Sequence, residues 1–161
     1  MLQLRPSTPA DAPTILSWCR DEGAFSRWTA GMLGGYPPTP DAFRFVEALT
    51  PFTAVEGDDP VGFFTLRQPG ERADELRFGF VIVDPARRGQ GLGRAMLRLG
   101  MAYAFEQRGA RRVSLGVFED NLPARRCYLA AGLRDVTGSE PETYRILGED
   151  LRCREMLLER P

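Results

Sequence analysis

The stretch VDPARRGQGLGRAML, residues 83–97, constrains the fold of this chain more than any other feature. Gly89, Gly91 and Gly93 alternate with larger residues between two apolar runs. Glycine lets a ligand come close to the main chain, and the first turn of a helix offers unpaired N–H groups with a partial positive charge. A strand, a glycine-rich turn and a helix N-terminus in this order predict a site for a phosphate or pyrophosphate group.

The residues on either side of the glycines fit this arrangement. In 75–83 the even-numbered residues are all apolar and alternate with a mixed set, which predicts a strand whose even-numbered side chains face the core. After the glycines, apolar residues recur at spacings of four, three and four, which predicts a helix running to about Gly109. The residues of this stripe are Leu92, Met96, Leu99 and Tyr103.

The rest of the chain alternates between expected strands and helices. Strands are expected at 2–6, twice within 51–68 around a turn at 57–60, at 111–118, and at 132–137 and 152–159. Helices are expected after the Thr-Pro pairs at 8–9 and 39–40, and from near Asn121 to Gly132, while 23–38 mixes a helical turn with Gly and Pro breakers. This order predicts one domain, 1–161, of the α/β or α+β class with a mixed sheet.

Composition excludes several classes of partner. Net charge is −1, so the chain lacks the positive footprint expected of a protein that binds nucleic acid or an anionic membrane. No apolar run approaches the ~18 residues of a membrane span, and the first residues do not resemble a signal peptide. We therefore expect a cytoplasmic protein that binds neither nucleic acid nor membrane.

The chain contains no histidine, and its three cysteines, Cys19, Cys127 and Cys153, lie far apart in sequence. This excludes Cys/His and Ser/His nucleophilic arrangements and leaves no ligand set for a metal such as zinc. The chemistry must use carboxylates, tyrosine, thiols or backbone groups.

Two common nucleotide loops do not fit the glycine stretch. The fingerprint G-x-G-x-x-G fails because Arg94 or Met96 stands where the last glycine belongs, and no Lys-Ser/Thr pair completes a Walker loop. Arg88, Gly91 and Gly93 instead resemble the R/Q-x-x-G-x-G/A signature of the GNAT superfamily, the acetyl-CoA-dependent N-acetyltransferases.

A second motif supports this resemblance. Residues 121–132 are similar to the superfamily pattern N-x-x-A-x-x-x-Y-x-x-x-G, with Asn121, Ala124, Tyr128 and Gly132 in the matching positions. The resemblance covers roughly residues 75–135 and implies a mixed, mostly antiparallel sheet of about six to seven strands flanked by helices. The ribosomal-protein N-acetyltransferase branch is one candidate subgroup.

The resemblance also implies how acetyl-CoA, as cosubstrate, binds. Main-chain N–H groups of 88–94 would cradle the pyrophosphate, and the backbone of 81–83 would pair with the pantetheine arm, which requires a gap between this strand and 111–118. Asn121 would bind the pantetheine end or, alternatively, cap a helix. The implied contacts are Val81, Ile82, Val83, Arg88, Gly89, Gln90, Gly91, Leu92, Gly93, Arg94, Asn121 and Tyr128.

Tyr128 matches the tyrosine that the superfamily often uses as general acid, protonating the departing CoA thiolate. The general base does not carry over, because Arg77 and Gly116 stand where two branches place a glutamate. Glu75 is the first candidate for the base, although it equally suits an ion pair with a surface arginine, and Glu119 and Glu149 are weaker candidates. Cys127 is expected to be a buried small residue rather than an acyl carrier.

The acceptor amine would contact the segment 17–38, where aromatic rings beside carboxylates suit a cation. The candidate residues are Trp18, Glu22, Trp28 and Tyr36. The leading hypothesis is direct acetyl transfer to a protein N-terminus or a small cationic amine such as a polyamine or aminoglycoside. The alternatives are an acyl-CoA-binding or sensing module without turnover, and a structural domain that has lost its ligand. The resemblance also allows a homodimer.

Overall fold

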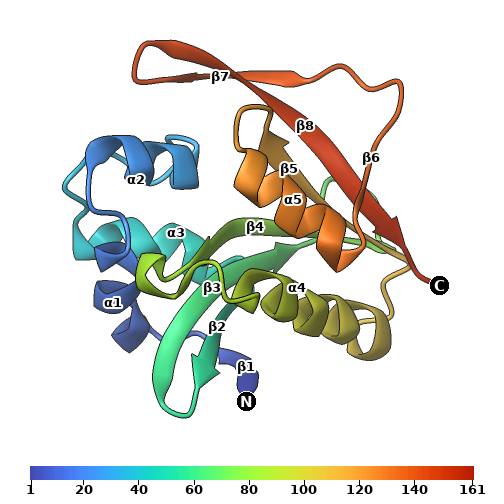
Figure 1. Ribbon diagram of the computed structural model, residues 1–161, viewed down its shortest axis with the longest axis horizontal. Helices are drawn as coiled ribbons and strands as arrows, with labels where there is room; N and C mark the ends of the chain where they lie inside the picture. The colour runs from blue at the N-terminus through green and yellow to red at the C-terminus, as the bar shows by residue number, and fades with distance from the viewer.

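The computed structural model describes residues 1–161 and places eight strands in one sheet with helices on both faces (Figure 1). The strands are β1 (Leu2–Pro6), β2 (Pro51–Glu56), β3 (Asp59–Arg67), β4 (Glu75–Val83), β5 (Arg112–Phe118), β6 (Arg134–Asp135), β7 (Glu142–Ile146) and β8 (Glu149–Glu159). The α-helices are α1 (Ala12–Ser17), α2 (Glu22–Thr29), α3 (Arg44–Glu47), α4 (Leu92–Ala102) and α5 (Leu122–Ala131). None of these helices is long and apolar enough to cross a lipid bilayer.

The strand order is β1-β2-β3-β4-β5-β8-β6, and β7 adds to β8 outside this path. Every pair is antiparallel except β4 and β5, which confirms the mixed, mostly antiparallel fold class. The sheet has eight strands, against an expectation of six to seven. The missed strand is β7, which a two-residue turn at Leu147 and Gly148 joins to β8. Both turn residues have positive φ, 48° and 82°, as tight hairpin turns require.

Two apolar cores lie on opposite faces of the sheet. The larger core has 20 buried residues and packs the sheet against α4 and α5. The smaller core has 11 buried residues and packs the sheet against α1, α2 and α3. Both faces of β3 and β4 are therefore covered by packed side chains.

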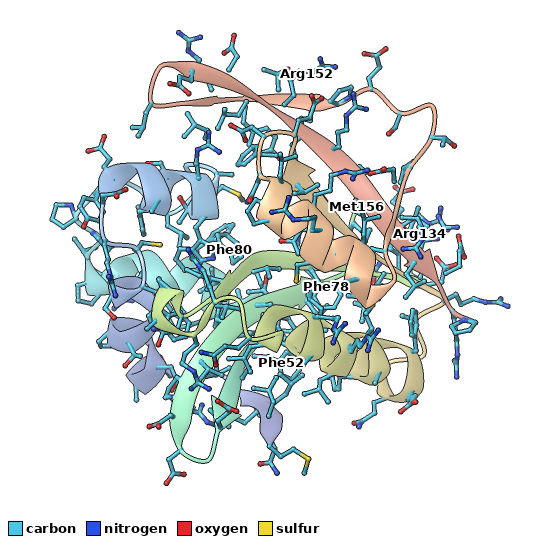
Figure 2. All side chains as sticks on the ribbon, in the orientation of Figure 1. Phe52, Phe78, Phe80, Arg134, Arg152 and Met156 are labelled. Carbon is cyan, nitrogen blue, oxygen red and sulfur yellow. The ribbon has the colours of Figure 1, made fainter.

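A β-bulge in β4 corrects the predicted alternation of this strand. The register with β3 shifts between Phe63 and Thr65, and Phe80 adopts a left-handed backbone with φ of 51°. Phe78 therefore belongs to the core beneath α4 and α5, whereas Phe80 packs against the opposite core beside α2 (Figure 2). Because the bulge adds one residue, side chains on either side of it no longer share a face by parity.

The predicted stripe of α4 is also partly wrong. Leu99 is 38% exposed, whereas Leu97 and Gly100 are buried against the sheet. A Cβ at Gly100 would lie 2.7 Å from Phe78 Cε1. Glycine at this position lets the helix approach the phenylalanine rings of the sheet, and this close contact turns Leu99 toward solvent.

Asp11 anchors the N-terminal helices to the sheet edge. Its carboxylate is 8% exposed and accepts two hydrogen bonds from the Arg5 guanidinium of β1, at 2.7 and 2.8 Å. It also accepts the Thr8 backbone N–H at 2.9 Å and the Thr53 hydroxyl of β2 at 3.2 Å. The hydrogen bonds from Arg5 hold the pKa of Asp11 well below its usual range. The predicted Thr-Pro start of the first helix is thus tied to two strands.

Candidate active site

The neighbouring strands β4 and β5 pair over three residues only. The parallel ladder joins Glu75–Arg77 to Arg112–Ser114 and then stops, so the strands separate beyond Arg77. The bulge at Phe80 lies within the separated part. The predicted gap is present, and it leaves the β5-facing backbone edge of 78–83 without a strand partner.

The segment 88–94 presents its backbone to the outside of the molecule at the end of β4. None of its N–H groups donates to an acceptor on the chain, and the first hydrogen bond of α4 runs from Ala95 N–H to Gly91 O at 3.1 Å. Gly89 and Gly91 have φ of 78° and 76°, and a Cβ at either would meet no atom within 4 Å. The left-handed backbone at these two glycines lets consecutive N–H groups point outward beside the positive end of a helix.

The arginines near this segment differ in whether they already form an ion pair with the chain. Arg87 forms an ion pair with Glu56 of β2 and donates from Nε to Gln90 Oε1 at 3.1 Å. Arg88 and Arg94 are exposed and form no ion pair on the chain. Positive charge is therefore available beside the free N–H groups, which favours an anionic ligand.

Gly93 has a packing role that the motif alone does not reveal. A Cβ at this position would lie 3.0 Å from Cys127 Sγ of α5 and 3.6 Å from Val83 Cγ2. The glycine therefore lets α4 and α5 approach each other at the end of β4. Burial raises the pKa of the Cys127 thiol, which keeps it protonated and fits the expected packing role.

Tyr128, on α5 next to Cys127, is 8% exposed and belongs to the larger core. Its hydroxyl forms no hydrogen bond with the chain and is not among the polar atoms sealed from solvent. Burial raises the pKa of the phenol above its ordinary value, so it remains protonated at neutral pH. A protonated hydroxyl with a free donor is the state that a general acid requires.

Asn121 precedes α5 and accepts a hydrogen bond from Ala124 N–H at 3.3 Å through its side chain. This is the helix-capping alternative expected from the sequence. The side chain is exposed, and its amide nitrogen stays available for a ligand.

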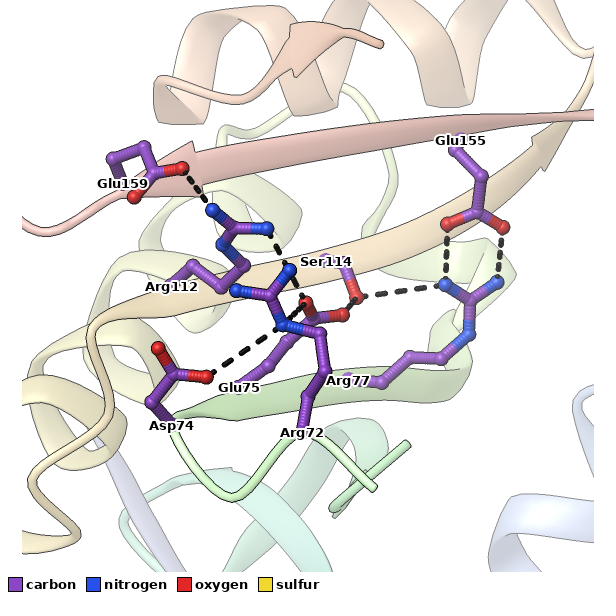
Figure 3. A network of polar contacts seen from close by, with 8 residues as sticks. All are labelled: Arg72, Asp74, Glu75, Arg77, Arg112, Ser114, Glu155 and Glu159. Atoms are coloured by element: carbon purple, nitrogen blue, oxygen red, sulfur yellow. Dashed lines mark hydrogen bonds and ion pairs between the residues drawn. The ribbon is translucent and has the colours of Figure 1, made fainter. Parts of the chain in front are cut away.

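Glu75 lies at the closed end of the strand pair within a network of partners (Figure 3). Its carboxylate accepts a hydrogen bond from the Ser114 hydroxyl at 2.7 Å and is 3.6 Å from Arg72 Nε and 3.9 Å from Arg112 Nη1. These contacts match the ion-pair alternative for Glu75. They engage both oxygens of its carboxylate.

Arg77 and Gly116, the two positions where a glutamate was absent, are neighbours in space. A Cβ at Gly116 would lie 3.0 Å from Arg77 Nη2 and 2.7 Å from Cys153 Sγ. The Arg77 guanidinium fills the space above the glycine and donates to both oxygens of Glu155 on β8, at 2.5 and 2.7 Å (Figure 3). An ion pair therefore stands where these two positions meet.

The four candidate acceptor contacts fall into different environments. Trp18 is 7% exposed within the smaller core, so its indole is not available to a ligand. Glu22 is exposed in the first turn of α2, and Trp28 on the same helix donates from Nε1 to Phe80 O at 2.9 Å. Tyr36 lines a groove of about 890 Å³ between α1 and α3.

The sequence did not predict a role for Glu155 or for the pair of Arg27 with Asp120. Arg27 of α2 donates to Asp120 at 3.0 and 2.7 Å, which links this helix to the end of β5 across 93 residues. Trp28, the next residue, holds α2 to the bulge of β4. Such pairings depend on strand order, and a charged residue on a single sequence carries no signal that names its partner.

Comparison with known proteins identifies the class. The acetyltransferase (GNAT) family profile matches residues 15–133, and the chain belongs to this family. A mycothiol acetyltransferase of Salinispora arenicola is 34% identical over 135 residues, covering 80% of this chain and 42% of that protein. A mycothiol acetyltransferase of Salinispora tropica is 36% identical over 111 residues, covering 66% of this chain and 34% of that protein. The chain thus spans less than half the length of these relatives.

Solved structures share the fold over nearly the whole chain. A spermidine N-acetyltransferase from Vibrio cholerae, in complex with CoA and spermine, has a TM-score of 0.80 at 18% identity, covering 98% of this chain and 95% of that one. A GNAT-family acetyltransferase from Bacillus anthracis has a TM-score of 0.79 at 15% identity, covering 98% and 94%. At these identities the likeness shows the fold alone.

Proposed function

We propose that this chain is an acetyl-CoA-dependent N-acetyltransferase that moves the acetyl group directly to a primary amine. The observation that carries the proposal is the run of free backbone N–H groups at 88–94, placed beside the unpaired edge of β4. An anion site and a free strand edge, side by side, suit a ligand that has a pyrophosphate at one point and an amide-bearing arm at the next.

Each part of acetyl-CoA has a fitting group on the chain. The pyrophosphate accepts hydrogen bonds from the N–H groups of 88–94, with Arg88 and Arg94 adding charge. The amides of the pantetheine arm pair with the backbone of 81–83 as an added strand, and Asn121 binds its end. The arm lies in the gap between β4 and β5, which directs the thioester toward Tyr128.

The transfer forms one carbon–nitrogen bond and breaks one carbon–sulfur bond. The amine nitrogen bonds to the acetyl carbonyl carbon, the carbon–sulfur bond breaks, and the Tyr128 hydroxyl gives its proton to the departing sulfur. The amine loses one proton, and the phenolate recovers one from solvent. Burial keeps the Tyr128 hydroxyl protonated at neutral pH, so its proton is present when negative charge develops on the departing sulfur.

The amine proton leaves through water in this proposal. Glu75, the first candidate for the base, is engaged by Ser114 and two arginines, and we assign it the structural role. The Phe80 carbonyl, which lies at the bulge, already accepts the Trp28 indole N–H. This carbonyl therefore holds α2 in place through Trp28, and we do not assign it a contact with the acceptor.

A small-molecule amine is the acceptor class that we favour over a protein N-terminus. The relatives reported above carry the names of small molecules, mycothiol and spermidine, which supports this choice. Trp18 is removed from the acceptor site because it is buried in the core. Glu22, Trp28 and Tyr36 remain candidates.

The test is release of CoA thiol from acetyl-CoA by the purified chain in the presence of a panel of primary amines. We expect amine-dependent thiol release together with one N-acetyl product per thiol, measured by mass spectrometry. The alternative, a binding or sensing module, predicts saturable acetyl-CoA binding without thiol release for any amine. Absence of both binding and turnover would contradict the proposal.

A further inference from the structure

Arg77 lies beside two glycines at the start of the gap. The register of β4 with β5, Glu75 opposite Arg112, brings Gly79 level with Gly116 when it is continued past Arg77. Both residues are glycines, and the Arg77 guanidinium reaches forward along the strands to lie against Gly116. A cationic group therefore stands where the strands begin to separate.

The guanidinium of Arg77 uses only one of its two bidentate edges. Its end-on fork, Nη1 and Nη2, donates to the two oxygens of Glu155 at 2.5 and 2.7 Å, and Nη1 also lies 3.5 Å from the Ser114 hydroxyl. Arginine has five N–H donors, and the edge made by Nε and the second Nη2 hydrogen makes no hydrogen bond with the chain. Nε keeps contact with solvent. The Nε–Nη2 edge therefore retains unused donors of the kind that pair with a carboxylate.

Glu155 holds Arg77 in position and remains accessible itself. Its side chain is 38% exposed, against 19% for Arg77. The pair is neutral as a unit, but it presents a positive edge from β4 and a negative edge from β8. A ligand that carries one charge of each sign, a short distance apart, matches this pair without leaving a charge uncompensated.

We propose that the acceptor is a zwitterionic α-amino acid, whose carboxylate binds the free edge of Arg77 and whose ammonium is drawn to Glu155 before it loses its proton. This inference rests on the proposed function and names its substrate class. A polyamine is disfavoured at this point, because its successive ammonium groups would meet the Arg77 cation. Arg77 and Glu155 act here as specificity-determining residues.

The experiment compares acceptors that differ in one charge. The twenty L-amino acids, their methyl esters and spermidine are each tested for thiol release from acetyl-CoA by the purified chain. For the preferred amino acid we expect kcat/KM roughly 10- to 100-fold above that of its methyl ester, because the ester cannot accept the charge-assisted pair from Arg77. We expect spermidine to be a weaker acceptor than the amino acid.

Variants separate recognition from folding. In Arg77→Gln the ratio of acid to ester should fall to about one, mainly through KM, while Arg77→Lys keeps part of it. Arg145→Gln is the matched control, because it removes an exposed arginine that pairs with Asp150 at 2.9 Å on the β7–β8 hairpin. Its acid-to-ester ratio should equal that of the unaltered chain. If Arg77 has a purely structural role, Arg77→Gln should lower kcat/KM equally for the amino acid and for its methyl ester. The acid-to-ester ratio would then be unchanged, which would overturn the inference.

The remaining outcomes are also decisive. A kcat/KM for the esters or for spermidine that equals or exceeds that of the amino acids would overturn this inference. The thiol release observed with those acceptors would still uphold the proposed function. No thiol release with any acceptor would overturn it as well, and a titration with acetyl-CoA would then show whether the proposed function also fails.

Discussion

Replacing Tyr128 by phenylalanine removes one oxygen atom whose only assigned role is to carry a proton. The hydroxyl forms no hydrogen bond with the chain, and the ring keeps its place in the core. The free energy of unfolding should therefore change by less than about 1 kcal/mol, since no internal hydrogen bond is broken. Loss of a general acid lowers kcat by roughly 10²- to 10⁴-fold. The affinity for acetyl-CoA should stay within about threefold, because the ligand contacts at 88–94 are untouched.

The assay is steady-state thiol release, with the free energy of unfolding measured by urea titration on the same preparations. Tyr103→Phe is the matched control, because Tyr103 packs on Phe52 with ring centroids 4.9 Å apart, beside β1 and β2 rather than at the gap between β4 and β5. We expect its kcat to be unchanged. An unchanged kcat in Tyr128→Phe, at equal stability, would refute the assignment of the general acid.

Since burial raises the pKa of Tyr128 above 10, its proton is retained at every pH below this value. In the unaltered chain, the part of kcat that depends on the Tyr128 proton should therefore show no decline between about pH 7 and pH 10. A decline with an apparent pKa near 8 that disappears in Tyr128→Phe would show that the phenol is not held protonated.

Three further substitutions test the fold and the base. Asp11→Asn should lower the free energy of unfolding by about 1–2 kcal/mol at pH 7, because it weakens the part-buried pair with Arg5 and the other hydrogen bonds to this carboxylate. The pKa of Asp11 is lowered by folding, so its contribution is complete above about pH 4, and the difference between variant and unaltered chain should shrink in urea titrations below that pH. Gly100→Ala should lower the melting temperature, because a Cβ placed 2.7 Å from Phe78 Cε1 costs ~1–3 kcal/mol. This cost exceeds the ~1 kcal/mol that alanine gains in helix propensity. A higher melting temperature would show that the phenylalanine rings can move aside. Glu75→Gln should leave the shape of the pH–rate profile unchanged, and a shifted lower limb would restore Glu75 as the base.

The sequence predicted the parts of the fold that depend on local chemistry. Apolar alternation located β4, the Thr-Pro pair located the start of the first helical segment, and the glycines with positive φ located the turn before α4. These signals are local, because backbone freedom and side-chain periodicity act over a few residues.

The missed features depend on long-range contacts or on unusual residues. The hairpin of β7 and β8 turns at Leu147 with φ of 48°, a conformation that leucine rarely adopts, so the turn was not recognised. The bulge at Phe80 gives no periodicity signal of its own, and the alternation was extended through it.

The candidate site shows the same division. The two motifs led to 88–94 and Tyr128, and the structure gives both a geometry that suits the predicted roles. The pairing of Arg77 with Glu155 joins residues 78 apart in sequence through the order β4, β5, β8, which no local pattern specifies. The absence of a glutamate at 77 and 116 was visible, but the contact between these two positions was not.

Calorimetric titration with acetyl-CoA measures whether the bare backbone at 88–94 binds the pyrophosphate of this ligand. The unaltered chain should give a saturable one-site isotherm. Gly91→Glu, which adds a side chain and a negative charge at the site, should bind at least about 100-fold more weakly. Gly138→Glu is the matched control, because Gly138 has a similar φ of 81° and equally open surroundings but lies between β6 and β7. It should bind like the unaltered chain. No binding by the unaltered chain, or equal binding by Gly91→Glu, would contradict the account.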